Sequence, residues 1–538
     1  MLYLCIFFFV TANAQQNSQK IIPTSDKLVS EVYTLSIEQG IAAPSLSGPW
    51  SVEEVLSMFS RINRESLSSA GKLRYDSVAD VLSRYNPSSE EGFSGATSLM
   101  IGFEGYYHTN DVDFQAEKDW YWDNEKRLPM ILLEGEAWLG ESFYLYSNFG
   151  VKNNRFFTPD ADAIVPSDIH MFSPTFSSNI LRNSAHDFDT PNRAFLAFGG
   201  DHYSFQMGRD LISWGAGVTG NLIIDDHVKY HEFIRLALFA EKVKFTSLTL
   251  FLEPPGYTTR DRAPYVPSQD SDPTIRMLLA HRFEFTPATW LRIELSENVM
   301  YQDTHFNAKY LNPLFIFHNL SNRSQFNAIA DITISATLVP NLLLYASWAI
   351  DQVAAPGEGN DQPNAMGYQL GILTLHHRPK GTWNLQAEVV YTDPYLYLRD
   401  KVDFVVMTRE RDQYYGYVPQ REFLGYQFGG DAFIASLMVD WKGINNFSGG
   451  GELFYMAHGS THMDTPYVFG EMPVISTPSA PITHTFRTGL WGSYRYSGEN
   501  LLHTAQLWAR IDLIQRQTDG NSAKETDLQL IMGISHTW

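Results

Sequence analysis

The sequence ends in DLQLIMGISHTW, residues 527–538, a stretch in which side-chain character alternates with a period of two. Mostly apolar or aromatic residues occupy one set of positions: Leu528, Leu530, Met532, Ile534, His536 and Trp538. The positions between them are mostly polar or small: Asp527, Gln529, Ile531, Gly533, Ser535 and Thr537. A strand with one apolar and one polar face suits a transmembrane β-barrel that has lipid outside and a polar lumen inside. The terminal aromatic residue is also typical of such barrels.

The same period extends through most of the chain upstream. Alternation and turn residues predict eighteen strands, an even number, as expected for a bacterial barrel. They span 95–108, 128–138, 142–151, 193–200, 203–209, 230–240, 243–253, 275–286, 289–300, 325–338, 341–352, 365–378, 382–393, 430–442, 447–458, 483–496, 500–514 and 526–538. The predicted fold class is therefore all-β, an antiparallel transmembrane outer-membrane β-barrel.

The connections between these strands alternate strictly between short and long. The short ones are 139–141, 201–202, 241–242, 287–288, 339–340, 379–381, 443–446 and 497–499. Long connections such as 109–127, 152–192, 210–229 and 394–429 separate them. Outer-membrane barrels have short periplasmic turns and long outer loops, whereas a soluble sandwich has no reason to sort its loops in this way. Both ends of the chain fall on the short-turn side, which predicts a periplasmic N-terminus and C-terminus.

Composition excludes several other classes. The net charge of −21 makes nucleic acid a poor partner, because a polyanion would be repelled. After residue 14 the sequence has no run of eighteen apolar residues, so a helical membrane span is not expected. Aromatic residues make up 14% of the chain, in keeping with half-buried strands and membrane interfaces. The single cysteine, Cys5, leaves the mature chain without disulfides.

The first ninety residues differ from the rest. Residues 1–14 are interpreted as a signal peptide, since an apolar stretch precedes the small-residue site Ala12-Asn13-Ala14. Residues 15–47 are interpreted as a flexible linker. Residues 48–90 are interpreted as a periplasmic helical segment. Ser51 and Glu54 form a capping box ahead of a helix from Val52. A second helix is expected over 73–85, and the barrel is expected to occupy 91–538.

Several short motifs carry a family resemblance. They are Met207-Gly208-Arg209-Asp210 with Ser213-Trp214-Gly215 and Gly217, His281-Arg282, Leu295-Ser296-Glu297, Tyr310-Leu311-Asn312-Pro313, and Leu424-Gly425-Tyr426 with Gly429-Gly430-Asp431. With these motifs the chain resembles the Wzi-type capsule-assembly outer-membrane proteins over most of residues 48–538. The resemblance implies a large monomeric barrel, plugged by loops, that binds capsular polysaccharide at the cell surface. It also implies a lectin-like protein without catalytic activity.

Three groups of residues are candidate polysaccharide contacts. Arg209, Asp210 and Trp214 lie where a strand meets an outer loop; they bind sugar or, as we favour, Arg209 and Asp210 pair as a luminal latch. Trp120 and Trp122 form either a stacking platform for sugar rings or part of the aromatic girdle. Tyr414 and Tyr415 lie in an arginine-rich loop that either meets acidic sugars or pairs with its own carboxylates.

Other clusters carry less. Asp160 and Asp162 lack the ligand spacing of a calcium loop, so they are interpreted as a turn, and no metal or cofactor is expected. His318 with Ser321, and Asp225-Asp226-His227, have no flanking hydrolase motif, so no enzyme is expected.

These observations predict a barrel that retains surface polysaccharide; the alternative is a passive or ligand-selective porin. Expected partners are surface or capsular polysaccharide, outer-membrane lipid, lipopolysaccharide, and the barrel-assembly machinery during biogenesis.

Overall fold

The computed structural model describes residues 18–85, 92–114, 121–123, 126–152, 157–158, 170–171, 175–180, 192–253, 275–317, 325–352, 363–399, 402–412, 416–444, 446–468, 471–473, 475–497 and 504–538. Within these ranges, no helix is both long and apolar enough to span a bilayer.

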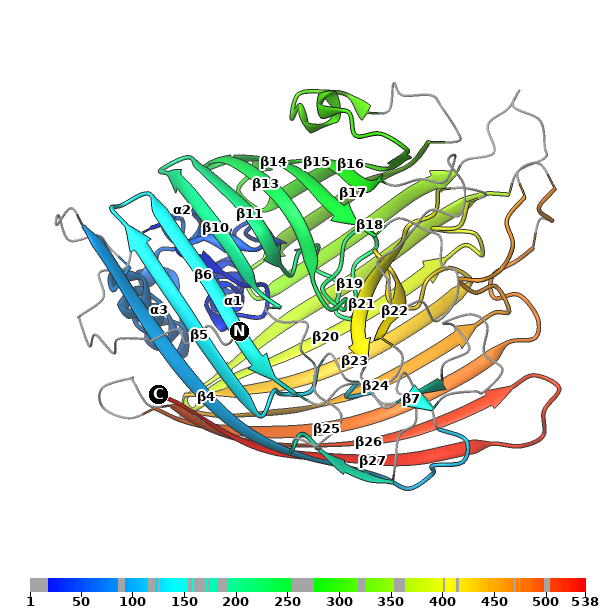
Figure 1. Ribbon diagram of the computed structural model, residues 1–538. Helices are drawn as coiled ribbons and strands as arrows, with labels where there is room; N and C mark the ends of the chain where they lie inside the picture. The colour runs from blue at the N-terminus through cyan, green and yellow to red at the C-terminus, as the bar shows by residue number, and fades with distance from the viewer. Residues whose placement is uncertain are drawn as a thin grey trace, which may run out of the picture.

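The main body of the molecule is a closed antiparallel β-barrel (Figure 1). Eighteen strands close it, which confirms the predicted fold class. A further three-residue strand, β9 (Phe176–Ser178), pairs with β4 beyond the point where β5 begins. The barrel strands are β4 (Phe93–His108), β5 (Ile131–Leu139), β6 (Phe143–Val151), β10 (Ala194–Gly200), β11 (Tyr203–Asp210), β13 (His231–Ala240), β14 (Val243–Leu252), β15 (Ile275–Ala288), β16 (Leu291–Asp303), β17 (Phe326–Val339), β18 (Leu342–Gln352), β19 (Ala365–Arg378), β20 (Gly381–Thr392), β23 (Ala432–Gly443), β24 (Phe447–His458), β25 (Thr483–Ser497), β26 (Thr504–Thr518) and β27 (Glu525–Thr537).

All eighteen predicted strands exist, and most boundaries are within three residues. The largest displacement is β26, which was expected over 500–514 and occupies Thr504–Thr518. Its polar end, Gln515-Arg516-Gln517, resembles a loop in sequence. In the structure this end continues the ladder, because Arg516 and Glu525 are cross-strand neighbours whose Nε and Oε2 lie 2.6 Å apart. The strict alternation of short and long connections follows from these boundaries.

A seam between the first and last barrel strands closes the wall. Residues 529–537 of β27 pair with residues 100–108 of β4. At the long-loop end of the seam, Asp527 is fully buried and accepts the backbone N–H groups of Thr109 and Asn110, each at 2.9 Å. His108 Nδ1 lies 3.3 Å from the same carboxylate.

The outside of the barrel carries two aromatic belts. Near the short turns, the rings of Trp383 and Trp441 lie 5.0 Å apart. Toward the long loops, Tyr368 contacts Trp348 and Tyr391 with ring centroids 6.2 and 6.1 Å apart. Trp383 and Tyr391 are both on β20, eight residues apart, which is about 26 Å along a strand and about 20 Å after the usual tilt. The apolar band between the belts therefore matches an outer membrane.

The N-terminal segment is not a linker followed by two helices, as predicted, but a folded unit that begins by residue 18. The interval 15–47, expected to be flexible, contains β1 (Ile21–Ile22), α1 (Lys27–Gln39) and half of β2 (Ser47–Gly48). Asp26 caps α1, and Gly40 ends it with φ 83°. The helical spacing of Leu28, Val32 and Leu35 was present in the sequence, and all three are buried.

The two helices that the sequence predicted are present as α2 (Val52–Phe59) and α3 (Ser69–Ser83). They pack with α1 into a small core of their own. The segment lies inside the barrel at its short-turn end (Figure 1). Ile37 packs against the inward-facing Leu343 and Tyr345, and its carbonyl accepts the N–H of Asn341 at 2.8 Å. We refer to residues 18–85 as the N-terminal plug.

Candidate functional site

The N-terminal plug meets the barrel wall through buried charges. Glu54 Oε1 accepts a 2.9 Å hydrogen bond from Arg235, whose side chain is fully buried. Ser51 Oγ accepts the N–H of Glu54 at 3.2 Å, so the predicted helix cap is present. The carboxylate of Glu54 is occupied by Arg235 and, at 3.7 Å, by Lys244. The second half of the predicted capping box has thus given way to a contact with the wall.

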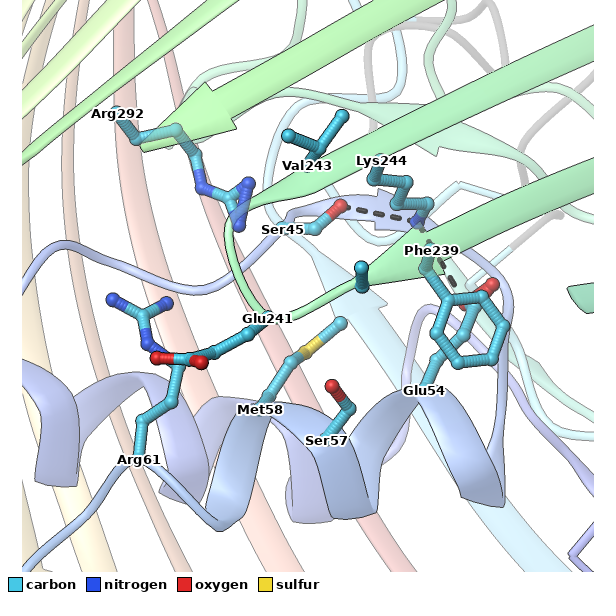
Figure 2. Close-up of a pocket in the computed structure, with 11 residues that line it drawn as sticks. Ser45, Glu54, Ser57, Met58, Arg61, Phe239, Glu241, Val243, Lys244 and Arg292 are labelled. Atoms are coloured by element: carbon cyan, nitrogen blue, oxygen red, sulfur yellow. Dashed lines mark hydrogen bonds and ion pairs between the residues drawn. The ribbon is translucent and has the colours of Figure 1, made fainter. Parts of the chain in front are cut away.

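A second carboxylate, on the wall itself, extends this network. Glu284 accepts a 3.0 Å hydrogen bond from Ser45 and lies 3.2 Å from Arg292. Lys244 donates to Ser45 Oγ at 3.1 Å and to the carbonyl of Ser47 at 3.0 Å (Figure 2). Charges removed from water need such complete pairing, because an isolated buried charge is very costly.

A small cavity lies between α2 and the turn that joins β13 to β14 (Figure 2). Met58 and Arg61 line it from the plug, and Glu241 and Lys244 line it from the wall. Its volume of about 30 Å³ has room for a water molecule or two, and none for a sugar ring.

The other half of the lumen is filled by two long connections, residues 211–230 and 393–431. The first contains β12 (Ser213–Trp214), and the second contains the hairpin β21 (Val405–Asp412) and β22 (Gly416–Phe423). Their apolar side chains pack against inward-facing apolar residues of the wall. The buried wall residues in this cluster are Phe233, Leu248, Leu250, Leu278, Ala280, Met300, Ile329, Ala349, Val390, Ala432, Ile434 and Phe454. The expectation of a polar lumen is therefore wrong for this half, because loops rather than water face the wall.

One wall carboxylate holds the tip of the first connection. Glu388 is 2% exposed and accepts the backbone N–H groups of Val218 and Thr219, both at 2.9 Å. Tyr345 and Gln369 also donate to it, at 2.7 and 2.9 Å. The loop is thus fixed by backbone contacts that do not depend on its side chains.

The two connections are also bonded to each other and to the N-terminal plug. Tyr397 Oη donates to the carbonyl of Leu222 at 2.5 Å and accepts the N–H of Tyr426 at 3.1 Å. Ser213 and Trp214 of β12 pair antiparallel with Gly48 and Ser47 of β2, respectively. We call this two-residue ladder the plug junction; it gives a continuous hydrogen-bonded path between the two ends of the lumen.

Two ionisable groups of the 211–230 connection have shifted pKa values. Burial and the charge of Asp225 raise the pKa of Asp226 to about 6. Burial alone would lower the pKa of His227, but its contact with Asp225, at 3.1 Å, outweighs burial and the pKa is raised. Asp225 also accepts the side-chain amide of Asn221 at 2.9 Å, and its N–H donates to the carbonyl of Leu424. The Asp225-Asp226-His227 sequence therefore braces the two connections against each other.

The structure separates Arg209 from Asp210, so the predicted latch between them is wrong. Asp210 points inward, is fully buried, and pairs with Arg193 at 2.7 Å. Arg209 points outward, where it pairs with Glu232 and lies 3.8 Å from the ring centroid of Tyr230. Adjacent residues of a strand face opposite sides, so the period of two already excluded this pair.

The remaining candidates are also placed, where the structure describes them. Trp214 is 2% exposed within the apolar cluster, which leaves almost no surface for a sugar ring. Trp122 packs against the inward-facing Tyr106 and Ile531, so it does not belong to the outer girdle. Trp120, Tyr414 and Tyr415 lie outside the described residues, as do Asp160, Asp162, His318 and Ser321. No group of three or more candidate metal ligands occurs in the described part of the chain.

Sequence reasoning missed a cationic cluster beside Trp122. The ring of Tyr121 lies between Arg487 and Arg510, each 3.8 Å from its centroid. Glu452 pairs with both arginines, at 2.8 and 3.3 Å. Alternation places Arg487 and Arg510 on the luminal face, but their common partner comes from a loop and could not be inferred from spacing.

A closed barrel with aromatic belts and a lumen filled from both ends defines a plugged transmembrane barrel. A family model described as capsule assembly protein Wzi matches residues 138–441, more than half of the chain. The chain therefore belongs to the Wzi capsule assembly family, and its location is the outer membrane.

Solved structures give the same fold. Wzi from Escherichia coli, an outer membrane protein involved in group 1 capsule assembly and a carbohydrate-binding β-barrel, has a TM-score of 0.57 and 15% identity; the match covers 96% of this chain and 98% of Wzi. Acinetobacter baumannii OccAB4 has a TM-score of 0.39 and 10% identity, over 84% of this chain and 100% of its own. Pseudomonas aeruginosa OccK1 (OpdK) has a TM-score of 0.38 and 10% identity, over 82% and 99%. No curated protein matches the chain significantly.

Proposed function

We propose that this protein binds capsular or other surface polysaccharide at the outer face of the outer membrane and retains it there without chemical change. The filled lumen carries the proposal. Loops bonded to the wall at Glu388 and to each other at Tyr397 form a fixed outer surface, as a binding protein needs. Family membership and the carbohydrate binding of Escherichia coli Wzi support the same function.

The alternative of a porin is less well supported. Porins have a polar, water-filled lumen. Here Leu248, Leu278 and Val390 face the lumen, are at most 1% exposed, and pack against the loops. Planar-bilayer recordings should therefore show little steady conductance for the native protein. Stable open channels, with conductance reduced by polysaccharide, would favour a ligand-selective porin.

The orientation and the contact residues are part of this proposal. We place both ends of the chain in the periplasm, with residues 1–14 removed as a signal peptide and a monomer as the functional unit. Lipopolysaccharide and the barrel-assembly machinery are proposed partners. Trp120, Trp122, Tyr414 and Tyr415 remain proposed sugar contacts, since they belong to the long connections that would face the outside.

Deleting the gene tests retention directly. Polysaccharide should move from the cell-attached fraction to the medium, while total synthesis stays constant. Unchanged attachment would reject the proposal. Incubating the purified protein with the released polysaccharide tests the non-catalytic part: chain length and reducing ends should not change.

A further inference from the structure

One long connection does not enter the lumen. The segment 304–317 follows β16 and contains a short 3-10 helix at Ala308–Leu311. It folds back over the outside of the wall, where Figure 1 shows it in green at the top. Its buried residues pack on outward-facing positions of β15, β16 and β17. The cluster consists of Met277, Leu279, Val299, Tyr301, Tyr310, Phe317 and Phe326.

Alternation along the strands shows that this contact is external. On β15, Leu278 and Ala280 face the lumen and belong to the luminal cluster. Met277 and Leu279 point the opposite way, toward the side where lipid would lie, yet both are fully buried. The segment 304–317 packs on these outward positions with its aromatic residues: Tyr310 lies 4.4 Å from Tyr301, ring to ring.

The segment also covers a polar pair on the outside of the wall. His281 and Glu297 are cross-strand neighbours with Nδ1 and Oε2 3.9 Å apart. The ring of Phe317 stacks on His281 at 4.7 Å, and the N–H of Phe317 donates to Glu297 at 3.3 Å. Glu297 is seven residues beyond Trp290 in the short turn, about 18 Å along the barrel axis after tilt. That height lies within the outer half of the apolar band, where a bare carboxylate is unfavourable.

The opposite face of the segment is apolar and exposed. Leu314 and Ile316 are 83% and 62% exposed, and Phe306 and Leu311 are 50% and 37% exposed. The sequence THFNAKYLNPLFIF, residues 304–317, contains no acidic residue and a single lysine, in a chain of net charge −21. This composition suits contact with hydrocarbon far better than contact with water or with a hydroxyl-rich polymer.

Continuity with the wall identifies what covers this face. Lower on the same strands, Phe283, Leu295 and Ile334 point outward and are 42%, 41% and 42% exposed. They belong to the band between the aromatic belts, whose surroundings are lipid. The exposed face of the segment extends that band outward without an intervening charged rim. We propose that residues 304–317 form a lipid-inserted flap, whose outer face contacts acyl chains of the outer leaflet and whose inner face seals the His281–Glu297 pair.

Site-directed spin labels can test this in phospholipid vesicles. In a Cys5→Ser background, Leu314→Cys and Ile316→Cys each receive a nitroxide; both positions are exposed, so the label should not disturb packing. Leu370→Cys, 62% exposed on the outward face of β19, is the lipid control. Ala523→Cys, exposed in the connection before β27, is the water control.

The readout is collisional access to molecular oxygen, which concentrates in lipid, against access to a water-soluble nickel chelate. Labels at 314 and 316 should match the label at 370, with an oxygen-to-nickel ratio several-fold above that at 523. A ratio equal to that at 523 would overturn the proposal, because the face would then lie in water. Dipolar broadening between labels on different molecules would also overturn it, since a second copy would then be the partner.

Discussion

The two halves of the lumen are filled in chemically opposite ways. At the short-turn end, the N-terminal plug meets the wall through Glu54, Arg235, Lys244, Glu284 and Arg292, all of them buried. At the long-loop end, the connections 211–230 and 393–431 meet the wall through an apolar cluster. The wall changes from charged to apolar along single strands: Lys244 and Leu248 are both inward residues of β14, four positions apart.

This difference separates specificity from stability. Apolar contacts are insensitive to direction, so they fill space and stabilise the loops in proportion to buried area. A buried ion pair adds little net stability, but it strongly disfavours any arrangement that leaves one charge alone. The N-terminal plug, which is a separate folded unit, is therefore held in one position by charges. The loops, tethered at both ends, need less direction and more burial.

The largest effect is expected from Glu54→Ala. It leaves the buried guanidinium of Arg235 without its carboxylate, at a cost of about 3–5 kcal/mol. Hydrogen exchange in α1 and α2 of the reconstituted protein should rise sharply, while exchange in β23–β26 stays unchanged. Glu65→Ala is the control, because Glu65 is 72% exposed and its ion pairs should be worth at most about 1 kcal/mol. Equal effects of the two changes would mean that charges do not position the plug.

Leu248→Ala should act on the other half. Leu248 is 1% exposed between the loops and the wall, so the change should cost about 3 kcal/mol. Exchange should rise in residues 211–230 and not in α2. Heat-modifiable gel mobility measures whether the whole barrel is weakened. Leu238→Ala, at a 45% exposed outward position, is the matched control. Loosening of the N-terminal plug by Leu248→Ala would show that the halves are not separate units.

The Arg193–Asp210 pair sharpens the comparison, because it is a buried charge contact in the apolar half. Asp210→Asn should cost about 1–3 kcal/mol, since Arg193 keeps a neutral partner. Arg209→Ala should change stability by less than about 1 kcal/mol, because its pairing with Glu232 is more exposed. A double-mutant cycle in urea should find Asp210 coupled to Arg193 and additive with Arg209. Coupling between Arg209 and Asp210 would contradict the placement of these side chains on opposite faces.

The smallest expected effect is on pH dependence. A raised pKa means that the folded loop binds its proton more tightly than the unfolded loop does. For Asp226, stability is therefore gained as pH falls through about 6 toward 4. For His227 the gain is complete below the unfolded pKa and is lost as pH rises through the raised folded pKa. Residues 211–230 should thus exchange more slowly at pH 5 than at pH 7.5, after correction for intrinsic rates. Asp226→Asn with His227→Gln should reduce this difference; an unchanged difference would assign it to other groups.

The sequence predicted those features that depend on local periodicity. Alternation and loop length located all eighteen strands, because each strand has one face toward lipid. The same rule, applied to Arg209 and Asp210, would have separated them. The apolar filling was not predictable. In β14, Leu248, Thr249, Leu250 and Phe251 form a nearly continuous apolar run, and apolar residues that face a loop look the same as those that face lipid. Contacts such as Glu388 with Thr219 join residues 169 positions apart, which no local pattern encodes.

The seam between β27 and β4 has a consequence for the order of assembly. Asp527 and His108 are separated by 419 positions, so bringing them together costs about 5 kcal/mol of loop-closure entropy before any contact repays it. Until the last strand is synthesised and paired, β4 presents a row of unpaired backbone groups from Met100 to His108. The nascent chain thus carries an open sticky edge for most of its synthesis. We expect the cell to shield that edge, and we expect the final strand to act as the timer for barrel closure.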